Sequence, residues 1–320
     1  MADEGWPRVT APTEARNPRT VGIDQVPILA LLHMLNAEDT LVPAAVAAVL
    51  PDLASVVDVA ARRIEAGGRL HYFGAGTSGR IATMDAAEVI PTFGVPPGII
   101  VAHHAGGAGA MRTPREALED SEQLGAEEAA ETGPSDVVVG LSASGRTPYV
   151  RGALRQAREQ GAFTVLVSSD PQASLAAYAD VHLAVATGPE AIAGSTRLKA
   201  ATAQKLVLNS LSTAVMIQCG RTWSNLMVEL EGRNEKLRAR LVRILEDATG
   251  EPPELCVTVL TEAEGDLKTA LVALLARCPV PAAAGALSAS GRDVRAALAS
   301  LDGASSGASS SASSPGKEPR

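Results

Sequence analysis

The stretch Leu70-His-Tyr-Phe-Gly-Ala-Gly-Thr-Ser-Gly-Arg80 decides the fold of this chain. A short, nearly all-apolar run leads into a glycine-rich turn with two hydroxyl residues, and the turn leads into a helical pattern. A run of this kind is typical of a parallel strand that is buried on both faces. The stretch therefore predicts a strand, a tight turn and a helix, which is the repeating unit of an α/β fold.

The same alternation of apolar runs and amphipathic segments continues to about residue 186. We predict strands at residues 70–73, 98–101, 136–139, 163–167 and 181–185. The expected helices between and after them cover residues 78–89, 115–132, 149–160 and 197–219. Together these elements predict a three-layer α/β fold, with a doubly wound parallel sheet between two layers of helices.

The flanking regions divide the chain further. Residues 24–60 follow a helical pattern with an apolar stripe through Ile28, Leu29 and Leu32, and residues 225–249 and 254–278 are expected to form a small helical module. We expect five segments: a disordered N-terminus at 1–12, an N-terminal helical segment at 13–60, the α/β sheet domain at 61–240, a C-terminal helical module at 241–300, and a disordered Ser/Gly-rich tail at 301–320.

Composition excludes several classes of protein. Hydrophobic residues make up 46% of the 320 residues, which is ample for a buried core, but aromatic residues make up only 2%. The formal net charge is −8, so neither stacking on bases nor attraction to phosphate backbones favours nucleic-acid binding. Three widely spaced cysteines give no disulfide framework, and no apolar run reaches membrane-spanning length. We expect a cytoplasmic protein with no nucleic-acid or membrane partner.

Hydroxyl-rich turns follow two of the predicted strands. The first is quoted above, the second is Gly140-Leu-Ser-Ala-Ser-Gly-Arg-Thr-Pro148, and the dense run 188–205 repeats the theme. In an open α/β sheet, ligands bind beyond the carboxyl ends of the strands, where helix N-termini favour anions. The alternative is that these turns merely cap helices. We expect a phosphosugar site lined by the following hydroxyl residues: Thr77, Ser78, Ser142, Ser144, Thr147 and Ser195.

Other ligand motifs are weak. No GxxxxGK[ST] loop is present, and the GxGxxG pattern of residues 74–79 lacks a following strand with an acidic end for a ribose. His103 and His104 could ligate a metal, but adjacent side chains rarely converge and no third ligand stands at a useful spacing, so we expect a pair of loop residues. We predict no cofactor and no metal.

A specific resemblance rests on the stretch Gly188-Pro-Glu-Ala-Ile-Ala-Gly-Ser-Thr-Arg-Leu-Lys-Ala-Ala-Thr-Ala-Gln-Lys205. It resembles the signature shared by N-acetylmuramic acid 6-phosphate etherases and glucokinase regulatory proteins, two groups of the SIS (sugar isomerase) domain superfamily. Both hydroxyl turns, Asp85-Ala-Ala-Glu-Val-Ile-Pro-Thr-Phe-Gly94 and Asn234-Glu-Lys-Leu237 also resemble the etherase pattern. The resemblance covers about residues 13–278. The regulatory proteins carry two such domains, and this chain has room for one.

The resemblance implies cleavage of the lactyl ether of N-acetylmuramic acid 6-phosphate with water, giving N-acetylglucosamine 6-phosphate and D-lactate during peptidoglycan recycling. It places a general acid on Glu88 and a second essential carboxylate on Glu119, which we assign as the base. Glu119 lies among Glu116, Asp120 and Glu122, which could instead form a solvated helix face. Glu88 lies among apolar residues, where partial burial would raise its pKa and keep it protonated.

Geometry raises a problem for Glu88. If Ser78 binds phosphate at a helix start, ten helical residues place Glu88 roughly 15 Å away. Either the helix breaks early or Glu88 serves the site of a second subunit, so we expect a symmetric homodimer with shared active sites, as SIS-domain proteins also imply. Arg197 or Lys199 could contact the ligand, but residues two apart on a helix point different ways, so one of them is expected to pair with an internal carboxylate such as Glu190.

Three competing functions remain at this stage. A sugar-phosphate isomerase on the same fold would also abstract a proton beside a carbonyl, but it would release no lactate. A non-catalytic sugar-phosphate sensor, a regulatory protein, would bind the same ligands without turnover. A DNA-binding regulator is disfavoured, because residues 1–50 carry six acidic and three basic side chains.

Overall fold

The structure is a computed structural model and describes residues 11–113, 116–230, 232 and 235–308. The chain divides into two compact units, which are described separately. The first comprises the described residues of 1–90 and 96–215, and the second those of 91–95 and 216–320. The predicted domain limits at residues 61, 240 and 300 stay predictions, because a compact unit need not coincide with a family domain.

A five-stranded parallel sheet forms the centre of the first unit. Its strands are β1 (Leu70–Gly74), β2 (Ile100–His104), β3 (Val137–Leu141), β4 (Phe163–Ser168) and β5 (Val181–Ala184). They lie in the order β2-β1-β3-β4-β5, and every neighbouring pair is parallel. All five predicted strands and the doubly wound α/β class are therefore confirmed. The register pairs Gly74 with both His104 and Leu141, so three strands end at one edge.

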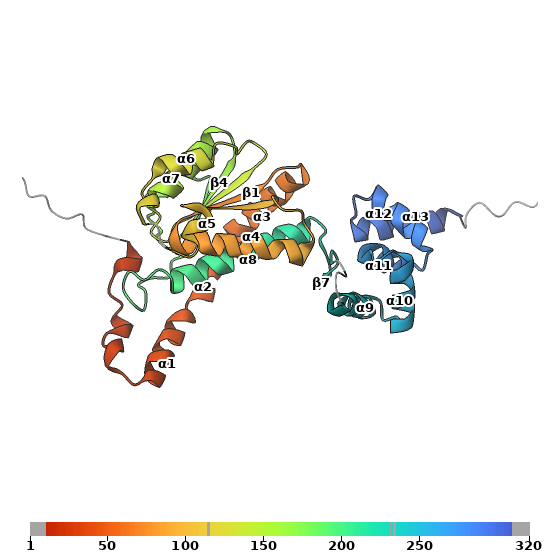
Figure 1. Cartoon of the computed structure of the whole chain (residues 1–320), viewed down its shortest axis with the longest axis horizontal. Coiled ribbons are helices and arrows are strands. Elements are labelled where there is room, and N and C mark those ends of the chain that lie inside the picture. The colour runs from red at the N-terminus through yellow and green to blue at the C-terminus, as the bar shows by residue number, and fades with distance from the viewer. Residues whose placement is uncertain (1–10, 114–115, 231, 233–234, 309–320) are drawn as a thin grey trace, which may run out of the picture. The chain divides into compact units, whose positions relative to one another are not determined.

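Helices cover both faces of this sheet (Figure 1). The main ones are α3 (Leu50–Glu65), α4 (Gly76–Phe93), α6 (Glu122–Glu128), α7 (Pro148–Glu159) and α8 (Lys199–Gln218). In the figure α6 and α7 lie on one side of the sheet, and α3, α4 and α8 lie on the other. Gly140 allows α7 to approach β3, because a Cβ there would lie 2.6 Å from Val150 Cγ1.

The remaining elements of the first unit are short or peripheral. The N-terminal region contains the 3₁₀ turns η1 (Pro12–Glu14), η2 (Pro18–Thr20) and η3 (Ile23–Gln25), then α1 (Ile28–Asp39) and α2 (Val42–Ala47). Further along the chain are α5 (Gly107–Ala110), η4 (Glu116–Leu118) and η5 (Ser174–Tyr178). In Figure 1, α1 extends away from the sheet. The predicted helical character of residues 24–60 is confirmed.

One predicted helix is wrong. Residues 115–132 do not form a single helix: η4 ends at Leu118, and α6 begins at Glu122. The side chain of Ser121 explains the restart, because its Oγ accepts a hydrogen bond from Leu124 N at 3.2 Å and so caps α6. Glu119 and Asp120 consequently lie in a connection between two helical turns rather than on an acidic helix face.

The second unit is a helical module with its own apolar core. A small hairpin of β6 (Thr222–Trp223) and β7 (Leu226–Met227) precedes α9 (Glu235–Thr249), α10 (Pro253–Glu262), α11 (Leu267–Ala276), α12 (Val280–Ala289) and α13 (Val294–Ala308). Helix α11 is central, since nearly all its side chains are buried. Within this core, Lys268 donates to the carbonyls of Gly220 and Arg292 and pairs with Glu229 at 2.6 Å.

Two expectations at the chain ends need correction. The predicted tail from residue 301 begins inside α13, whose first residues pack against α11 and α12 and whose Ala-rich sequence has high helix propensity. At the other end, Ala11 is buried and Pro12 begins η1, so predicted disorder up to residue 12 is wrong for these two residues. Residues 1–10 and 309–320 lie outside the described residues.

Among the described helices, none alone is long and apolar enough to cross a membrane, although two bent pairs meet that test together.

Candidate functional site

A cavity of about 410 Å³ opens at the edge of the sheet where β1, β2 and β3 end. The parallel register brings the turn after β1, the end of β2 and the turn after β3 to this one place, so residues far apart in sequence line it together. Five of the six predicted hydroxyl residues lie on its wall: Thr77, Ser78, Ser142, Ser144 and Thr147.

Two helices begin at this cavity. Helix α4 starts at Gly76, within the first turn, and α7 starts at Pro148, directly after the second. The first backbone N–H groups of a helix have no partner within the helix, and the helix dipole adds positive potential there. The cavity wall therefore offers hydroxyls and two helix N-termini to an anion.

The second turn is held in shape by its own side chains. Ser142 is buried, and its Oγ accepts hydrogen bonds from the backbone N–H groups of Arg146 at 3.3 Å and Thr147 at 3.4 Å. Its Oγ also lies 2.8 Å from Thr147 Oγ1. Gly145 has φ of +65°, and a Cβ there would lie 2.2 Å from Ala173 Cβ, so both the backbone conformation and the packing require glycine.

The first turn depends on a histidine that the sequence analysis did not select. His104 lines the cavity at the end of β2, and its Nε2 lies 3.1 Å from Gly76 O. A Cβ at Gly79 would lie 2.0 Å from His104 Cδ2, so glycine at this position leaves room for the ring. The expectation that His103 and His104 lie in a loop is wrong, because β2 continues through His104 by pairing with Gly74.

His71, which is buried, and His103, which is partly buried, form a hydrogen-bonded pair on neighbouring strands. His71 Nδ1 lies 3.0 Å from His103 Nε2, and the His103 ring stacks on Phe73 with centroids 4.1 Å apart. Burial lowers the pKa of both histidines, that of His103 to about 4, so the pair is neutral near pH 7. Within the described residues, no group of three or more His, Cys, Asp or Glu side chains could hold a metal ion.

Glu119 lies on the cavity wall, close to the first turn. A Cβ at Gly76 would be 3.9 Å from Glu119 Oε2. The backbone carbonyl of Glu119 accepts a hydrogen bond from Tyr149 N at 3.0 Å, which fixes the connection between η4 and α6 against the start of α7. The second carboxylate that the sequence selected is thus brought to the hydroxyl-lined cavity.

Glu88 is not brought to the same cavity within one chain. Helix α4 runs without a break from Gly76 to Phe93, through Pro91, so an early helix end does not carry Glu88 back toward the turn. Its side chain is exposed in the single chain, and the partial burial expected from its apolar neighbours is wrong for this state.

Asp85, in the same motif, is the buried carboxylate. It accepts hydrogen bonds from Tyr72 Oη at 3.1 Å, Asn209 Nδ2 at 2.6 Å and Ser212 Oγ at 3.1 Å. Burial raises its pKa, and the three donors act against that rise. Asp85 therefore joins α4 to β1 and α8, which fixes the helix that begins at the first turn.

The run 188–205 contributes less directly than expected. Gly194 and Thr196 line the cavity, but Ser195 does not. Lys199 is buried, and its Nζ lies 2.7 Å from Glu38 Oε2, while Glu190 accepts hydrogen bonds from the backbone N–H groups of Lys199 and Ala200 at 2.9 Å each. The expected pairing of one basic residue with an internal carboxylate is confirmed for Lys199, with Glu38 as the partner of its ammonium group. Arg197 is exposed and does not line the cavity.

Sequence reasoning also missed Glu14 and Arg80, which both line the cavity. Arg80 donates to the carbonyls of Met111 at 3.1 Å and Ala110 at 2.9 Å, so it closes one wall. Arg80 directly follows the first turn in sequence, and this position could have predicted that it lines the cavity. Glu14 reaches the cavity only through the folding of the N-terminal segment, for which the sequence offered no local signal.

This fold and its cavity define the protein as a SIS-domain protein. The SIS domain family matches residues 111–214, and the N-terminal SIS domain of glucokinase regulatory protein matches residues 52–158. A solved phosphoheptose isomerase from Francisella tularensis is similar in fold, with a TM-score of 0.50 and 18% identity over 60% of this chain and 100% of that chain.

Curated relatives narrow the class to a family. The chain is 57% identical over 267 residues to the N-acetylmuramic acid 6-phosphate etherase of Thermobifida fusca, covering 83% of this chain and 88% of that protein. It is 49% identical to the etherase of the same name from Streptomyces avermitilis, covering 91% of this chain and 94% of that protein. The chain belongs to the N-acetylmuramic acid 6-phosphate etherase family.

Proposed function

We propose that this protein cleaves the lactyl ether of N-acetylmuramic acid 6-phosphate, giving N-acetylglucosamine 6-phosphate and D-lactate in the recycling of peptidoglycan amino sugars. The observation that carries the proposal is one cavity that joins hydroxyl-lined helix N-termini to Glu119. The names of relatives at 45–57% identity support the same activity.

The phosphate end of the substrate would bind at the hydroxyl turns. Thr77 and Ser78 at the start of α4 and Ser142, Ser144 and Thr147 before α7 can donate hydrogen bonds to a dianion, and both helix dipoles favour its charge. Ser195 would act through the shape of its loop, since its neighbours Gly194 and Thr196 line the cavity. This anchoring holds the sugar carbons within reach of carboxylates that line the same cavity.

Elimination followed by hydration is the chemistry that suits such a site. In the open-chain aldehyde, the C2 hydrogen is acidified by the neighbouring carbonyl. We assign Glu119 as the base that takes this proton, while the C3–O bond breaks and Glu88 gives a proton to the departing lactate oxygen. Water then adds at C3 and gives a proton to Glu88, which the first step left ionised, while Glu119 returns its proton to C2, so both carboxyl groups regain their starting states. No cofactor is required for these steps.

A homodimer with shared sites is part of the proposal. Glu88 lies outside the cavity of its own chain, on a surface where Met84 and Ile90 are 47% and 37% exposed. On α1, Ile28, Leu29 and Leu32 are 71%, 67% and 54% exposed, an apolar face that a lone helix in water leaves uncovered. A second copy would cover these surfaces and bring its Glu88 to the cavity. We place this dimer in the cytoplasm, where thiols such as those of the three cysteines stay reduced.

Lactate release tests the function. The purified protein is incubated with N-acetylmuramic acid 6-phosphate and a chelator in ¹⁸O-labelled water. Mass spectrometry then measures the ¹⁸O content of the lactate and of the sugar. We expect unlabelled D-lactate and one ¹⁸O at C3 of the sugar, because the ether oxygen leaves with the lactate. Label in the lactate would refute the elimination. Sugar isomers without lactate would indicate an isomerase, and binding without turnover would indicate a sensor.

Mixed dimers test the sharing. Glu88→Gln and Glu119→Gln subunits, each inactive alone, should regain part of the activity when they are combined, because one of the two sites then carries both carboxylates. Verified heterodimers with no activity would contradict the sharing of sites between chains.

A further inference from the structure

A third carboxylate, Glu14, reaches the phosphosugar cavity from the N-terminal segment. Glu14 ends η1 and lines the cavity, and its side chain is exposed, so a ligand in the cavity can reach it. The segment lies against the loop before α8, since Gly194 N donates to Thr13 O at 3.0 Å. A Cβ on Gly194 would lie 2.7 Å from Glu14 Oε2, so the glycine leaves room for the carboxylate.

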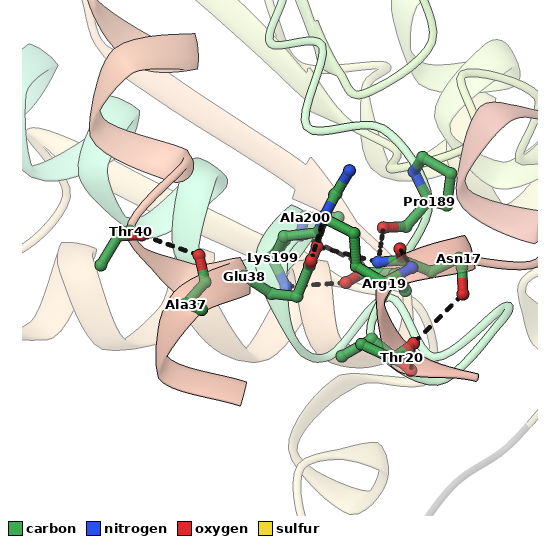
Figure 2. A network of polar contacts seen from close by, with 11 residues as sticks. Asn17, Arg19, Thr20, Ala37, Glu38, Thr40, Pro189, Lys199 and Ala200 are labelled. Carbon is green, nitrogen blue, oxygen red and sulfur yellow. Dashed lines mark hydrogen bonds and ion pairs between the residues drawn. The ribbon is translucent and has the colours of Figure 1, made fainter. Parts of the chain in front are cut away.

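Polar and charged side chains that converge on the buried Glu38 hold this segment in place (Figure 2). Asn17 Nδ2 donates to Glu38 Oε2 at 2.8 Å and to Pro189 O at 3.2 Å, and Arg19 Nη2 donates to Glu38 Oε2 at 2.9 Å. The ammonium group of Lys199 binds the same carboxylate. Figure 2 shows that these side chains converge from the N-terminal turns, α1 and the start of α8. Asn17 and Arg19, a few residues after Glu14, thus anchor the segment to parts of the chain that are distant in sequence. These contacts help to fix the position of Glu14.

The charge of Glu14 restricts what it can bind. An ionised carboxylate only accepts hydrogen bonds, so it repels a phosphate dianion. The hydroxyl side chains and the N-termini of α4 and α7 occupy the phosphate-binding part of the same cavity wall. Glu14 therefore suits the uncharged part of a phosphosugar, which carries hydroxyl and amide N–H donors.

We propose that Glu14 is a further substrate-contacting residue, which accepts a hydrogen bond from a hydroxyl or amide N–H of the sugar and so selects for the sugar rather than the phosphate. This inference rests on the proposed function. It adds to Glu88 and Glu119 a carboxylate whose role is recognition.

Two probes separate recognition of the sugar from binding of the phosphate. Glu14→Gln is titrated calorimetrically with N-acetylglucosamine 6-phosphate and with inorganic phosphate. We expect about tenfold weaker binding of the phosphosugar, which equals about 1.4 kcal/mol for loss of a charge-assisted hydrogen bond. Inorganic phosphate should bind equally well or more tightly, because a negative charge has been removed. Asp24→Asn is the matched control: an exposed carboxylate in the same segment that does not line the cavity.

Each outcome decides between the alternatives. Unchanged affinity for both probes means that Glu14 does not contact the sugar, and weaker binding of both means that it only supports the fold; either result overturns the inference. Lactate release by the wild-type protein is measured on the same preparation. If the wild type releases lactate and Glu14→Gln binds the phosphosugar normally, the inference fails and the proposed function stands. If the wild type binds the phosphosugar but releases no lactate, the function fails and the titration still tests Glu14. A wild type that binds no phosphosugar overturns both.

Discussion

The buried Glu38–Lys199 pair gives the sharpest prediction for stability. Glu38 is buried, and Lys199 is completely so. The hydrogen bond from Arg19, together with those from Lys199 and Asn17, lowers the pKa of Glu38 from 4.5 to about 2. Because the folded-state pKa lies below the unfolded one, the stabilisation is complete above about pH 4.5 and is lost as the pH falls toward 2.

The size of this contribution follows from the pKa difference. A fall from 4.5 to about 2 corresponds to about 3 kcal/mol at 1.36 kcal/mol per pH unit. Arg19 is 55% exposed, so water and salt screen its share, and we reduce the figure to about 2 kcal/mol. Glu38→Gln should lower the free energy of unfolding by about 3 kcal/mol at pH 6.5, because Lys199 is then left buried without its anion.

Equilibrium urea unfolding followed by circular dichroism measures the effect at pH 6.5 and pH 3. The gap between wild type and Glu38→Gln should narrow by about 1 kcal/mol or more at pH 3, because the wild type then begins to lose its charge-dependent stability. Asp39→Asn, an exposed carboxylate on the same helix, is the control and should change stability by less than about 0.5 kcal/mol. Equal losses in the two variants, or a gap that does not change with pH, would refute the reasoning.

Three further predictions concern the site and its supports. Glu119→Gln should slow lactate release by about 10²-fold or more while calorimetry finds nearly unchanged affinity for N-acetylglucosamine 6-phosphate; a comparable loss of affinity would speak against a role in proton transfer. Asp85→Ala should cost about 2 to 4 kcal/mol in urea unfolding, because Tyr72 and other buried donors lose their acceptor, and a loss below about 1 kcal/mol would contradict the anchoring of α4. Gly152→Ala should lower thermal stability by about 2 kcal/mol or more, because its Cβ would meet the carbonyl of Glu122 at 1.9 Å, whereas Gly285→Ala, with open space around it, should be neutral or stabilising. Equal melting temperatures for the two alanine variants would show that α6 and α7 adjust freely.

Local patterns were sufficient to predict the sheet and both hydroxyl turns. Each strand is a short apolar run next to a turn, and a parallel sheet aligns strand ends, so Thr77 and Ser142 could be placed at one edge without coordinates. The helix at 115–132 failed for the opposite reason. Its amphipathic pattern is continuous, and the break depends on the single side-chain cap of Ser121. The hydrophobic periodicity is read over a window of many residues, so it does not detect a helix break that depends on one side chain.

Residues placed by long-range contacts could not be predicted. Glu14 lies 180 residues from Gly194 in sequence, and no periodicity or turn motif relates the two. Lys199 was correctly expected to pair internally, yet its partner Glu38 comes from α1 rather than from the neighbouring loop. Such contacts depend on how the N-terminal segment packs against the loop before α8 and the start of that helix, and no local pattern in a single sequence predicts that path.

The acidic residues have different roles because some are buried and others are exposed. Glu38 and Asp85 are buried, so their charges are held by donors that would otherwise be left unsatisfied, and neither can move a proton without disturbing the fold. Glu14, Glu88 and Glu119 are exposed in the single chain, so a substrate or a second subunit can reach them. Replacing a buried ion pair with apolar residues is often neutral for stability, so Glu38 and Lys199 are better explained by the position they give the N-terminal segment than by stability alone. That position carries Glu14 to the cavity, and the same buried pair thereby links the stability of the segment to the recognition of the sugar.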